Sequence, residues 1–213
     1  MGDENSAAVL RAWQDAEYIL PLDDVVRREV WDGNIPVRLE LAKEDISTYD
    51  HPLPFFLQVP RMGYLPLFLG PARAYFQKHA PPMSADREAW VEYQGTPLRW
   101  HVPLGVLFDL LADEQELPWR LTLHLSGFPD KKLLPYAGEA TARGHFFQTL
   151  KQSMHLRYGS SKRVNNLTVA QMDQLWAAVR ESSFDRYAEA SVALLKPLLS
   201  GPKGLEESRR VPV

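Results

Sequence analysis

The sequence predicts an α+β fold in which a mixed sheet, covered by helices on one face, precedes a helix-rich region. Three observations predict it. Apolar and polar residues alternate in several short segments between residues 35 and 125, a pattern typical of half-buried strands. Segments with apolar residues at helical spacing lie between these strands. From Pro129 onward only the helical spacing remains until the last few residues, so helices should dominate there.

Two strands and a helix open the predicted sheet region. Alternation covers Ile35–Leu41 and returns over Phe55–Val59, after a loop rich in Asp, Ser, Thr and Pro. We expect these two strands to pair. A helix then starts at Gly70-Pro71, because proline suits the first helical position. Pro81-Pro82 ends it.

A hairpin, a second helix and a last strand follow. Two aromatic-rich segments flank Gln94-Gly95-Thr96, which predicts a β-hairpin with a positive φ at glycine. Pro103 opens the helix, and Leu121–Leu125 forms the strand. The order is strand, strand, helix, strand, strand, helix, strand. This order is compatible with a ubiquitin-like β-grasp but does not by itself prove that fold.

The helix-rich region begins with an amphipathic helix over residues 139–156. At about 100° per residue, its apolar side chains cover a sector roughly 100° wide. These side chains are Phe146, Phe147, Leu150 and Met154. Lys151 points about 40° beyond the edge of this sector. That amine is therefore a candidate functional group or, alternatively, a lysine whose stem covers the helix edge.

Further helices follow a break. Residues 157–166 are expected to interrupt the helix. Thr168 and Gln171 then have the spacing of a capping box at the start of the next helix. A last helix passes through Phe184 and ends near Pro197 and Gly201.

We also have expectations for both ends of the chain. Ala7–Leu20 should form a short amphipathic helix, and residues 201–213 should form a polar tail that ends like the start of a strand. The acidic N-terminus lacks the apolar core of a signal peptide. The longest segment without charged residues, Met62–Ala72, has 11 residues, fewer than the roughly 20 that span a bilayer. We therefore expect a cytosolic protein.

The net charge of −3 hides an asymmetry. Residues 1–130 contain 11 Lys and Arg against 20 Asp and Glu, a net −9, whereas residues 131–213 contain 13 against 7, a net +6. This is either a composition difference between two subdomains or a basic face for an acidic partner or anionic lipid. Nucleic acid is not expected as a partner, because no Lys/Arg cluster is interleaved with aromatic residues.

Most catalytic chemistry has no support in the sequence. The chain has no cysteine, which excludes disulfides, thiolate metal sites and thiol catalysis. Phosphate-binding, dinucleotide-binding, nucleophile-elbow and zinc-protease motifs are absent. The six histidines lie on different predicted elements, and Glu114 and Glu116 fit a solvated turn. We therefore expect no catalytic residue, metal or cofactor.

The six tryptophans should mostly pack in the core or the hairpin. One or two on an exposed groove would instead anchor a partner helix.

A long segment resembles the autophagy protein 5 family. The resemblance is carried by WVEYQGTPLRWHVPLGVLFDLLA (residues 90–112) and LPWRLTLHLSGFPDKKLL (117–134). Upstream it includes VVRREVWDGNIPVRLEL, VPRMGYLPL and YFQKH, and downstream GHFFQTLK, DQLW and SFDRY. The likeness covers roughly residues 24–190.

The resemblance implies a domain organisation and a site. It implies an N-terminal extension over 1–22, a ubiquitin-like domain over 23–128 and a helix-rich domain over 129–200. Residues 201–213 are then a tail or the start of a second ubiquitin-like domain that this sequence lacks. In the family, one lysine of the helical domain joins the C-terminal glycine of autophagy protein 12 through an isopeptide bond. That lysine follows the HF pair by five residues, which here, after His145-Phe146, is Lys151.

The resemblance also implies partners. The conjugate binds autophagy protein 16 and promotes transfer of autophagy protein 8 onto phosphatidylethanolamine, in peripheral contact with the autophagosome precursor membrane. In the family, the missing second domain helps to build the groove for autophagy protein 16. The resemblance therefore does not decide whether this chain binds autophagy protein 16. The chain is then no enzyme itself but a substrate of the conjugating enzymes. The alternatives are a non-conjugated ubiquitin-like adaptor that binds a partner helix, or a fragment without function.

An acceptor lysine needs little chemistry of its own. Near neutral pH only about one lysine amine in a few thousand is neutral, given an ordinary pKa near 10.4. The partner enzyme must therefore supply deprotonation or desolvation, and this chain need only present the amine. Lys131, Lys132 and Lys162 serve as internal comparisons on expected loops.

Overall fold

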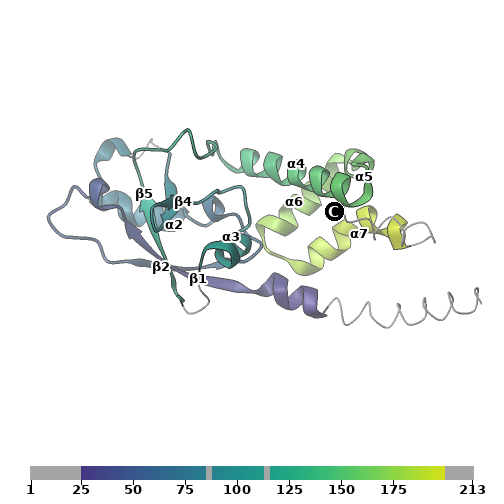
Figure 1. The fold of residues 1–213 in the computed structure, drawn as a ribbon, viewed down its shortest axis with the longest axis horizontal. Helices are drawn as coiled ribbons and strands as arrows, with labels where there is room; N and C mark the ends of the chain where they lie inside the picture. Colours follow the sequence, from purple (N-terminus) through teal and green to yellow (C-terminus); the bar gives the residue numbers. More distant parts are fainter. Residues whose placement is uncertain (1–24, 85–87, 113–115, 200–213) are drawn as a thin grey trace, which may run out of the picture.

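The structure is a computed structural model that describes residues 25–84, 88–112 and 116–199. A five-stranded sheet covered by helices precedes a group of helices (Figure 1). The predicted α+β class and the predicted order of strands and helices are confirmed. The expected helix over Ala7–Leu20 and the expected tail over 201–213 lie outside the described residues. Within the described ranges, no helix is both long and apolar enough to cross a membrane.

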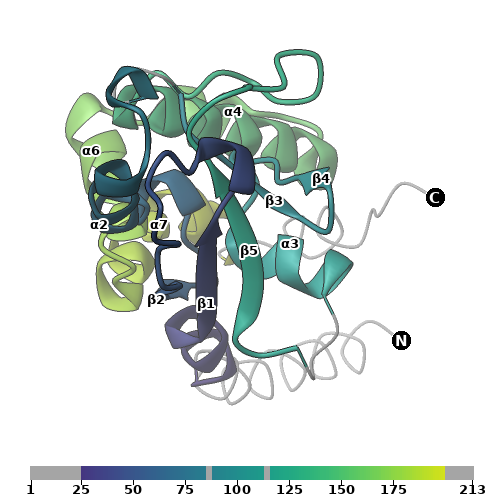
Figure 2. The same ribbon diagram turned by 90° about the vertical axis from the view of Figure 1, so that its left-hand side faces the viewer.

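The sheet has the strand order β2-β1-β5-β3-β4. Strands β1 (Asn34–Leu41) and β5 (Trp119–His124) run parallel at its centre (Figure 2). Strand β2 (Phe55–Pro60) pairs antiparallel with β1, so the predicted pairing of the first two strands is confirmed. Strand β3 (Trp90–Tyr93) pairs antiparallel with β5 and with the edge strand β4 (Thr96–Pro97).

The first hydrophobic core lies between one face of this sheet and two helices, α2 (Gly70–Phe76) and α3 (Leu104–Leu111). The inward residues of β1 are all buried, and Leu39 is completely inaccessible. Burial of such a side chain contributes about 1.5–3 kcal/mol. Strand alternation therefore gives this face of the sheet its core, and the opposite face carries the polar residues of each strand.

The predicted hairpin is confirmed. Its two central residues, Gln94 and Gly95, have φ angles of 48° and 79°. A two-residue turn with two positive φ values matches the twist of the flanking strands. A Cβ on Gly95 would contact no atom within 4 Å, so backbone conformation rather than space favours glycine here.

Short 3-10 helices connect the larger elements of the sheet region. Their bounds are Lys43–Asp45, Leu65–Leu67, Gln77–His79 and Pro82–Ser84.

Four helices form the second region: α4 (Glu139–Tyr158), α5 (Lys162–Asn165), α6 (Val169–Arg180) and α7 (Phe184–Leu199). The predicted first helix extends two residues further than expected, to Tyr158. The expected interruption over 157–166 is confirmed, because α4 ends at Tyr158, but this segment also contains the short helix α5, which was not expected. That helix has four residues, too few to show a helical period, and it buries Val164.

The capping box at the start of α6 is confirmed. The Gln171 backbone N–H donates to Thr168 Oγ1 at 3.3 Å, and the Thr168 backbone N–H donates to Gln171 Oε1 at 2.9 Å. These bonds satisfy backbone donors that a helix leaves unpaired at its start.

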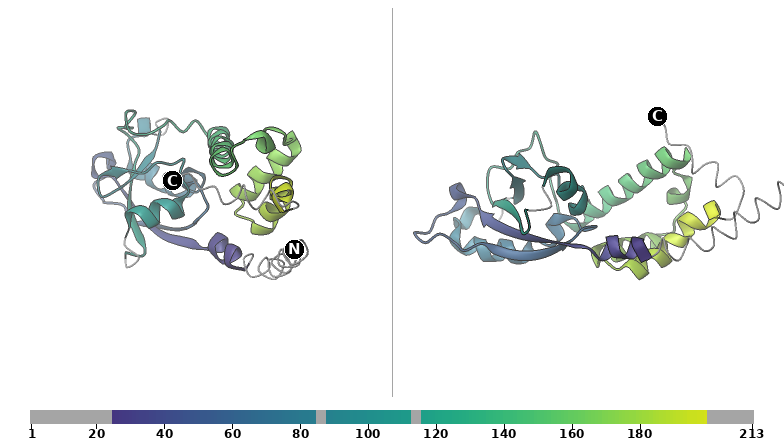
Figure 3. Two further views of the ribbon diagram at one scale, coloured as in Figure 1. Left: turned by 45° about the vertical axis from the view of Figure 1, so that its right-hand side comes forward. Right: turned by 60° about the horizontal axis from the view of Figure 1, so that its bottom comes forward.

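The chain segment before β1 packs on the bundle rather than on the sheet. Residues 25–32 are helical and lie beside α7 (Figure 3). Trp31 is buried there, with its ring centroid 6.1 Å from that of Phe184 and 4.5 Å from that of Tyr187. Its Nε1 donates to the Ser182 carbonyl at 2.9 Å. The sequence patterns did not predict this contact between segments about 150 residues apart.

The tryptophans in the described ranges serve packing, as one of the two interpretations predicted. Four are buried, namely Trp31, Trp100, Trp119 and Trp176. Trp90 is half-buried and stacks on His124 with ring centroids 3.9 Å apart. None of these five tryptophans is exposed.

Candidate functional site

Lys151 lies near the middle of α4, on a half-buried position. No hydrogen bond or ion pair joins its amine to another residue in the part of the chain that the structure describes. The helix ends at Gly159, whose φ of 71° is left-handed and whose N–H donates to the His155 carbonyl at 2.7 Å. This glycine cap fixes the end of the helix two turns after the lysine.

The apolar face of α4 packs as predicted. Phe147 and Met154 are buried, while Phe146 and Leu150 are partly buried against the second hydrophobic core. Lys151 follows Phe147 by one helical turn, so its stem starts at the margin of this buried face. The observed burial agrees with the predicted position at the edge of the apolar sector.

The start of α4 is fixed to α6 by polar contacts. Trp176 Nε1 donates to Glu139 Oε1 at 2.8 Å, and Arg180 Nη1 lies 3.2 Å from the same oxygen. The hydrogen bond from Trp176 lowers the pKa of the Glu139 carboxyl, and Arg180 lowers it further. One helical turn later, Arg143 pairs with Asp173 at 2.7 Å. These contacts set the position of α4 on the bundle.

A histidine pair joins α4 to the sheet region. The His145 ring on α4 lies 5.5 Å from that of His101 and 5.0 Å from that of Trp100, between centroids. Burial lowers the pKa of His101, and the neighbouring His145 and Arg99 lower it further. Nδ1 of His101 is buried without a hydrogen-bond partner among the described residues. No sequence pattern predicts this pair, because the two residues are 44 positions apart.

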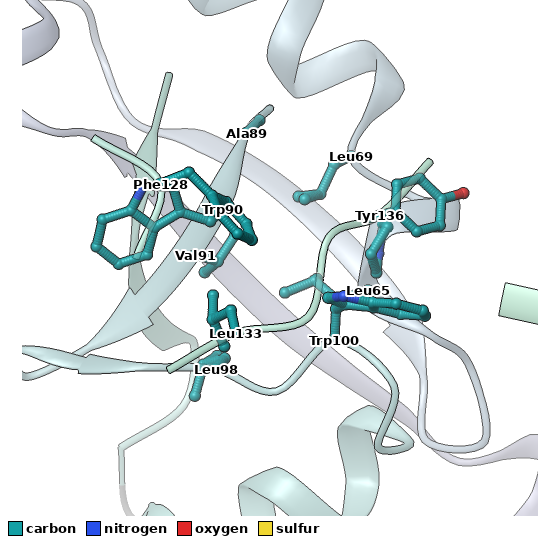
Figure 4. A pocket seen from close by; sticks show the side chains of 11 residues that line it. Leu65, Leu69, Ala89, Trp90, Val91, Leu98, Trp100, Phe128, Leu133 and Tyr136 are labelled. Atoms are coloured by element: carbon teal, nitrogen blue, oxygen red, sulfur yellow. The ribbon is translucent and has the colours of Figure 1, made fainter. Parts of the chain in front are cut away.

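Hydrogen bonds from two tryptophans and apolar packing hold the segment between β5 and α4 on the sheet region. Trp90 Nε1 donates to the Ser126 carbonyl at 2.8 Å, and Trp100 Nε1 donates to the Leu134 carbonyl at 2.6 Å. Leu133 and Tyr136 converge with these rings on a small apolar cavity (Figure 4). Its volume is about 20 Å³, room for about one water molecule, so it is a packing defect rather than a ligand site.

The surroundings of Lys151 are basic. Residues 140–172 contain five Lys and Arg and no Asp or Glu. Near the end of α4, the guanidinium groups of Arg157 and Arg163 lie 5.5 and 5.7 Å from the Tyr158 ring centroid. No carboxylate of the described chain pairs with Lys151, Arg157 or Arg163. Among the described residues, no ion pair therefore neutralises the positive charge of these three side chains.

The comparison lysines have different environments. Lys131, Lys132 and Lys162 are all exposed, whereas Lys151 is half-buried. Lys162 begins the short helix α5, and the other two lie in the segment before α4. Within the described ranges, no group of three or more His, Asp or Glu residues could hold a metal ion. Glu116 accepts a hydrogen bond from the Tyr93 hydroxyl, and Glu114 lies outside the described residues.

Two family models match the chain. The first, described as "Autophagy protein ATG5, UblA domain", matches residues 30–125. The second, "Autophagy protein ATG5, alpha-helical bundle region", matches residues 139–197, which include Lys151.

Known relatives carry the same name. Autophagy protein 5 of Arabidopsis thaliana is 38% identical over 165 residues, covering 78% of this chain and 48% of that protein. Autophagy protein 5 of Aspergillus clavatus is 31% identical over 210 residues, covering 88% of this chain and 64% of that protein. The crystal structure of Kluyveromyces marxianus Atg5 is similar with a TM-score of 0.69 and 26% identity, covering 78% of this chain and 68% of that one. The chain thus spans about half the length of the plant protein.

Proposed function

Because the chain belongs to the autophagy protein 5 family, we propose that Lys151 accepts autophagy protein 12 through an isopeptide bond. The neutral Nζ amine attacks the carbonyl carbon of a thioester that a conjugating enzyme carries at the modifier's C-terminal glycine. A C–N bond forms and the C–S bond breaks. The amine loses a proton, and the departing enzyme thiolate takes one up. This chain supplies the amine alone and is no enzyme in itself.

The observation that carries this proposal is the placement of one amine on a fixed helix. Lys151 stands five residues after His145-Phe146, the family's spacing. Contacts of Glu139, Arg143 and His145 fix the preceding turns of the helix. A fixed position supports productive encounter, because attack on a carbonyl requires reacting atoms about 3–3.5 Å apart. No ion pair with the described residues has to break before the amine reacts.

The charge around Lys151 indicates the kind of surface that must approach it. A segment of 33 residues without a carboxylate, 140–172, favours a partner with acidic residues near its reactive thioester. Such attraction acts mainly on the association rate and weakens with salt. We therefore expect conjugation to slow as ionic strength rises.

We propose further that the chain acts in the cytoplasm as a scaffold of autophagosome formation. In this proposal, the conjugate binds autophagy protein 16 and promotes lipidation of autophagy protein 8, in peripheral contact with the precursor membrane. Residues 23–128 act as a ubiquitin-like domain and residues 129–200 as a helix-rich domain. Residues 1–22 precede these two domains, and residues 201–213 follow them. Because the chain spans about half of its plant relatives, these roles are proposed for the whole protein.

A reconstituted conjugation reaction tests the site. The chain is incubated with autophagy protein 12, its activating and conjugating enzymes and ATP, and a denaturing gel reveals the product. We expect a band heavier by one modifier, which Lys151→Arg abolishes because a guanidinium is not a usable nucleophile. Lys162→Arg should leave the band unchanged.

The outcomes separate the competing roles. A band that survives in Lys151→Arg would place the acceptor on another lysine. A complete absence of product with the unmodified chain would favour a non-conjugated adaptor.

A further inference from the structure

The outer face of the sheet, opposite to α2 and α3, carries an unusual row of side chains. The strand registers place Phe56 of β2 opposite Arg38 of β1, and Arg38 opposite Arg120 of β5. Phe56 is 62% exposed, and Arg120 is exposed as well. We call Phe56, Arg38 and Arg120 the arginine row. It has no part in the proposed acceptor site on α4.

The two arginines of this row are poorly satisfied within the chain. Like charges on neighbouring strand positions repel each other. Arg38 Nη2 pairs with Glu40 at 2.6 Å, but its Nε is buried without a hydrogen-bond partner. Arg120 has no hydrogen bond or ion pair with any described residue. The strand register therefore places two arginines on neighbouring positions, and among the described residues one carboxylate, that of Glu40, forms an ion pair with them.

An open hollow of about 700 Å³ lies over the arginine row. Its remaining walls are apolar at Leu117 and Pro118 and polar at Gln94 and Glu116. Leu117 is 48% exposed. The Glu116 carboxylate already accepts a hydrogen bond from the Tyr93 hydroxyl, so it does not serve the arginines in this arrangement. The hollow thus combines two cationic groups with exposed aromatic and aliphatic surface.

The next row of the same face is acidic, which narrows the chemistry of a partner. Glu40 stands opposite Thr122, and Thr122 stands opposite Glu92. Residues two positions apart on a strand are separated by about 6.6–6.8 Å. A polyanion such as a nucleic acid strand would place its successive charges against these carboxylates. A single carboxylate beside an apolar group fits the two rows and the hollow.

We propose that this hollow binds a segment of a partner protein that presents one carboxylate next to a large apolar side chain. The carboxylate lies between the guanidinium groups of Arg38 and Arg120, where charge-assisted hydrogen bonds replace their mutual repulsion. The apolar side chain packs on Phe56 and Pro118. Arginine and aromatic residues often dominate binding energy in such contacts, which favours a short segment over a broad interface.

Titration with short peptides tests this proposal on the whole 213-residue chain. The probe is an eight-residue peptide with aspartate next to phenylalanine in a Gly-Ser background. Two matched probes replace the aspartate by asparagine or the phenylalanine by alanine. Binding is followed by NMR through the backbone amides of Phe56, Arg38 and Arg120. We expect shifts at these amides and at least about tenfold weaker binding for each matched probe.

Two variants assign the effect to the arginine row. Arg120→Gln should weaken binding of the acidic probe at least about tenfold, whereas Arg99→Gln, at another exposed arginine, should not change it. The thermal midpoint of Arg120→Gln should stay equal or rise, because one of two repelling charges is removed. A fall in that midpoint would mean that Arg120 supports the fold, and it would overturn the proposal.

Other results would also overturn it. Equal binding of the aspartate and asparagine probes would show that the arginines do not recognise a carboxylate. If no backbone amide of the outer face shifted in the NMR titration, the peptide would not bind at this hollow. Sedimentation that shows a dimer, lost in Arg120→Gln, would assign the face to a second copy of the chain instead.

Discussion

The strands of the sheet are held by apolar burial across strand registers, whereas the start of α4, the helix that carries Lys151, is held in addition by polar contacts with α6. In the sheet region, the inward residues of β1 and β5 are buried without polar partners. In the bundle, Trp176 donates to Glu139, and Trp31 donates to Ser182. The sheet therefore follows from the period of apolar residues, while the placement of the candidate acceptor depends on a few individual side chains.

A core substitution in the sheet should have the largest effect. Leu39→Ala removes a completely buried side chain and should lower the free energy of unfolding by about 2–5 kcal/mol. Urea unfolding measures the change. Leu110→Ala, at a 74% exposed position on α3, is the control and should change stability by less than about 0.5 kcal/mol. Similar losses in both variants would contradict the description of this core.

A substitution that removes a polar contact of the bundle should affect stability locally. Trp176→Phe keeps an aromatic ring but removes the hydrogen bond to Glu139, which should cost about 1–3 kcal/mol. Hydrogen exchange should become faster in the first turns of α4, while the amides of β1 keep their protection. Trp90→Phe, which removes the bond to Ser126 in the sheet region, is the matched control and should leave α4 protected. If hydrogen exchange became equally faster in α4 and in β1, the two regions would not be stabilised separately.

A pH titration should show the smallest effect, at the contact between the two regions. The pKa of His101 lies below its ordinary 6.5, mainly because the ring is buried. The unfolded chain then binds the proton more readily, so this contribution to stability is complete above pH 6.5 and is lost as the pH falls below it. His101→Gln should flatten this part of the stability profile.

The same titration has an internal control. Gln152→Ala, at an exposed position of α4 without a titratable side chain, should leave the slope of the profile unchanged. An unaltered slope in His101→Gln would show that the histidine pair is not the source of the pH dependence.

The sequence was most informative where one residue pattern fixes one local structure. Alternation over Ile35–Leu41 predicted β1 and its buried face, and Thr168 with Gln171 predicted the start of α6. The edge position of Lys151 also followed from helical period alone.

Contacts between distant segments could not be predicted in this way. The contact of Trp31 with α7 and that of His101 with His145 depend on how separate elements pack together, and no local sequence period predicts such packing. The opposition of Arg38 and Arg120 depends on which residues of two strands align. A shift of one residue would have turned one of them inward.

Peptide mapping of the conjugate by mass spectrometry identifies the side chain that carries the modifier. After digestion of the purified product, we predict that the residue of the modifier's C-terminal glycine is attached to Nζ of Lys151 and to no other side chain. A branch on Lys131, Lys132 or Lys162 would contradict the account, since the fixed helix would then not present the reacting amine.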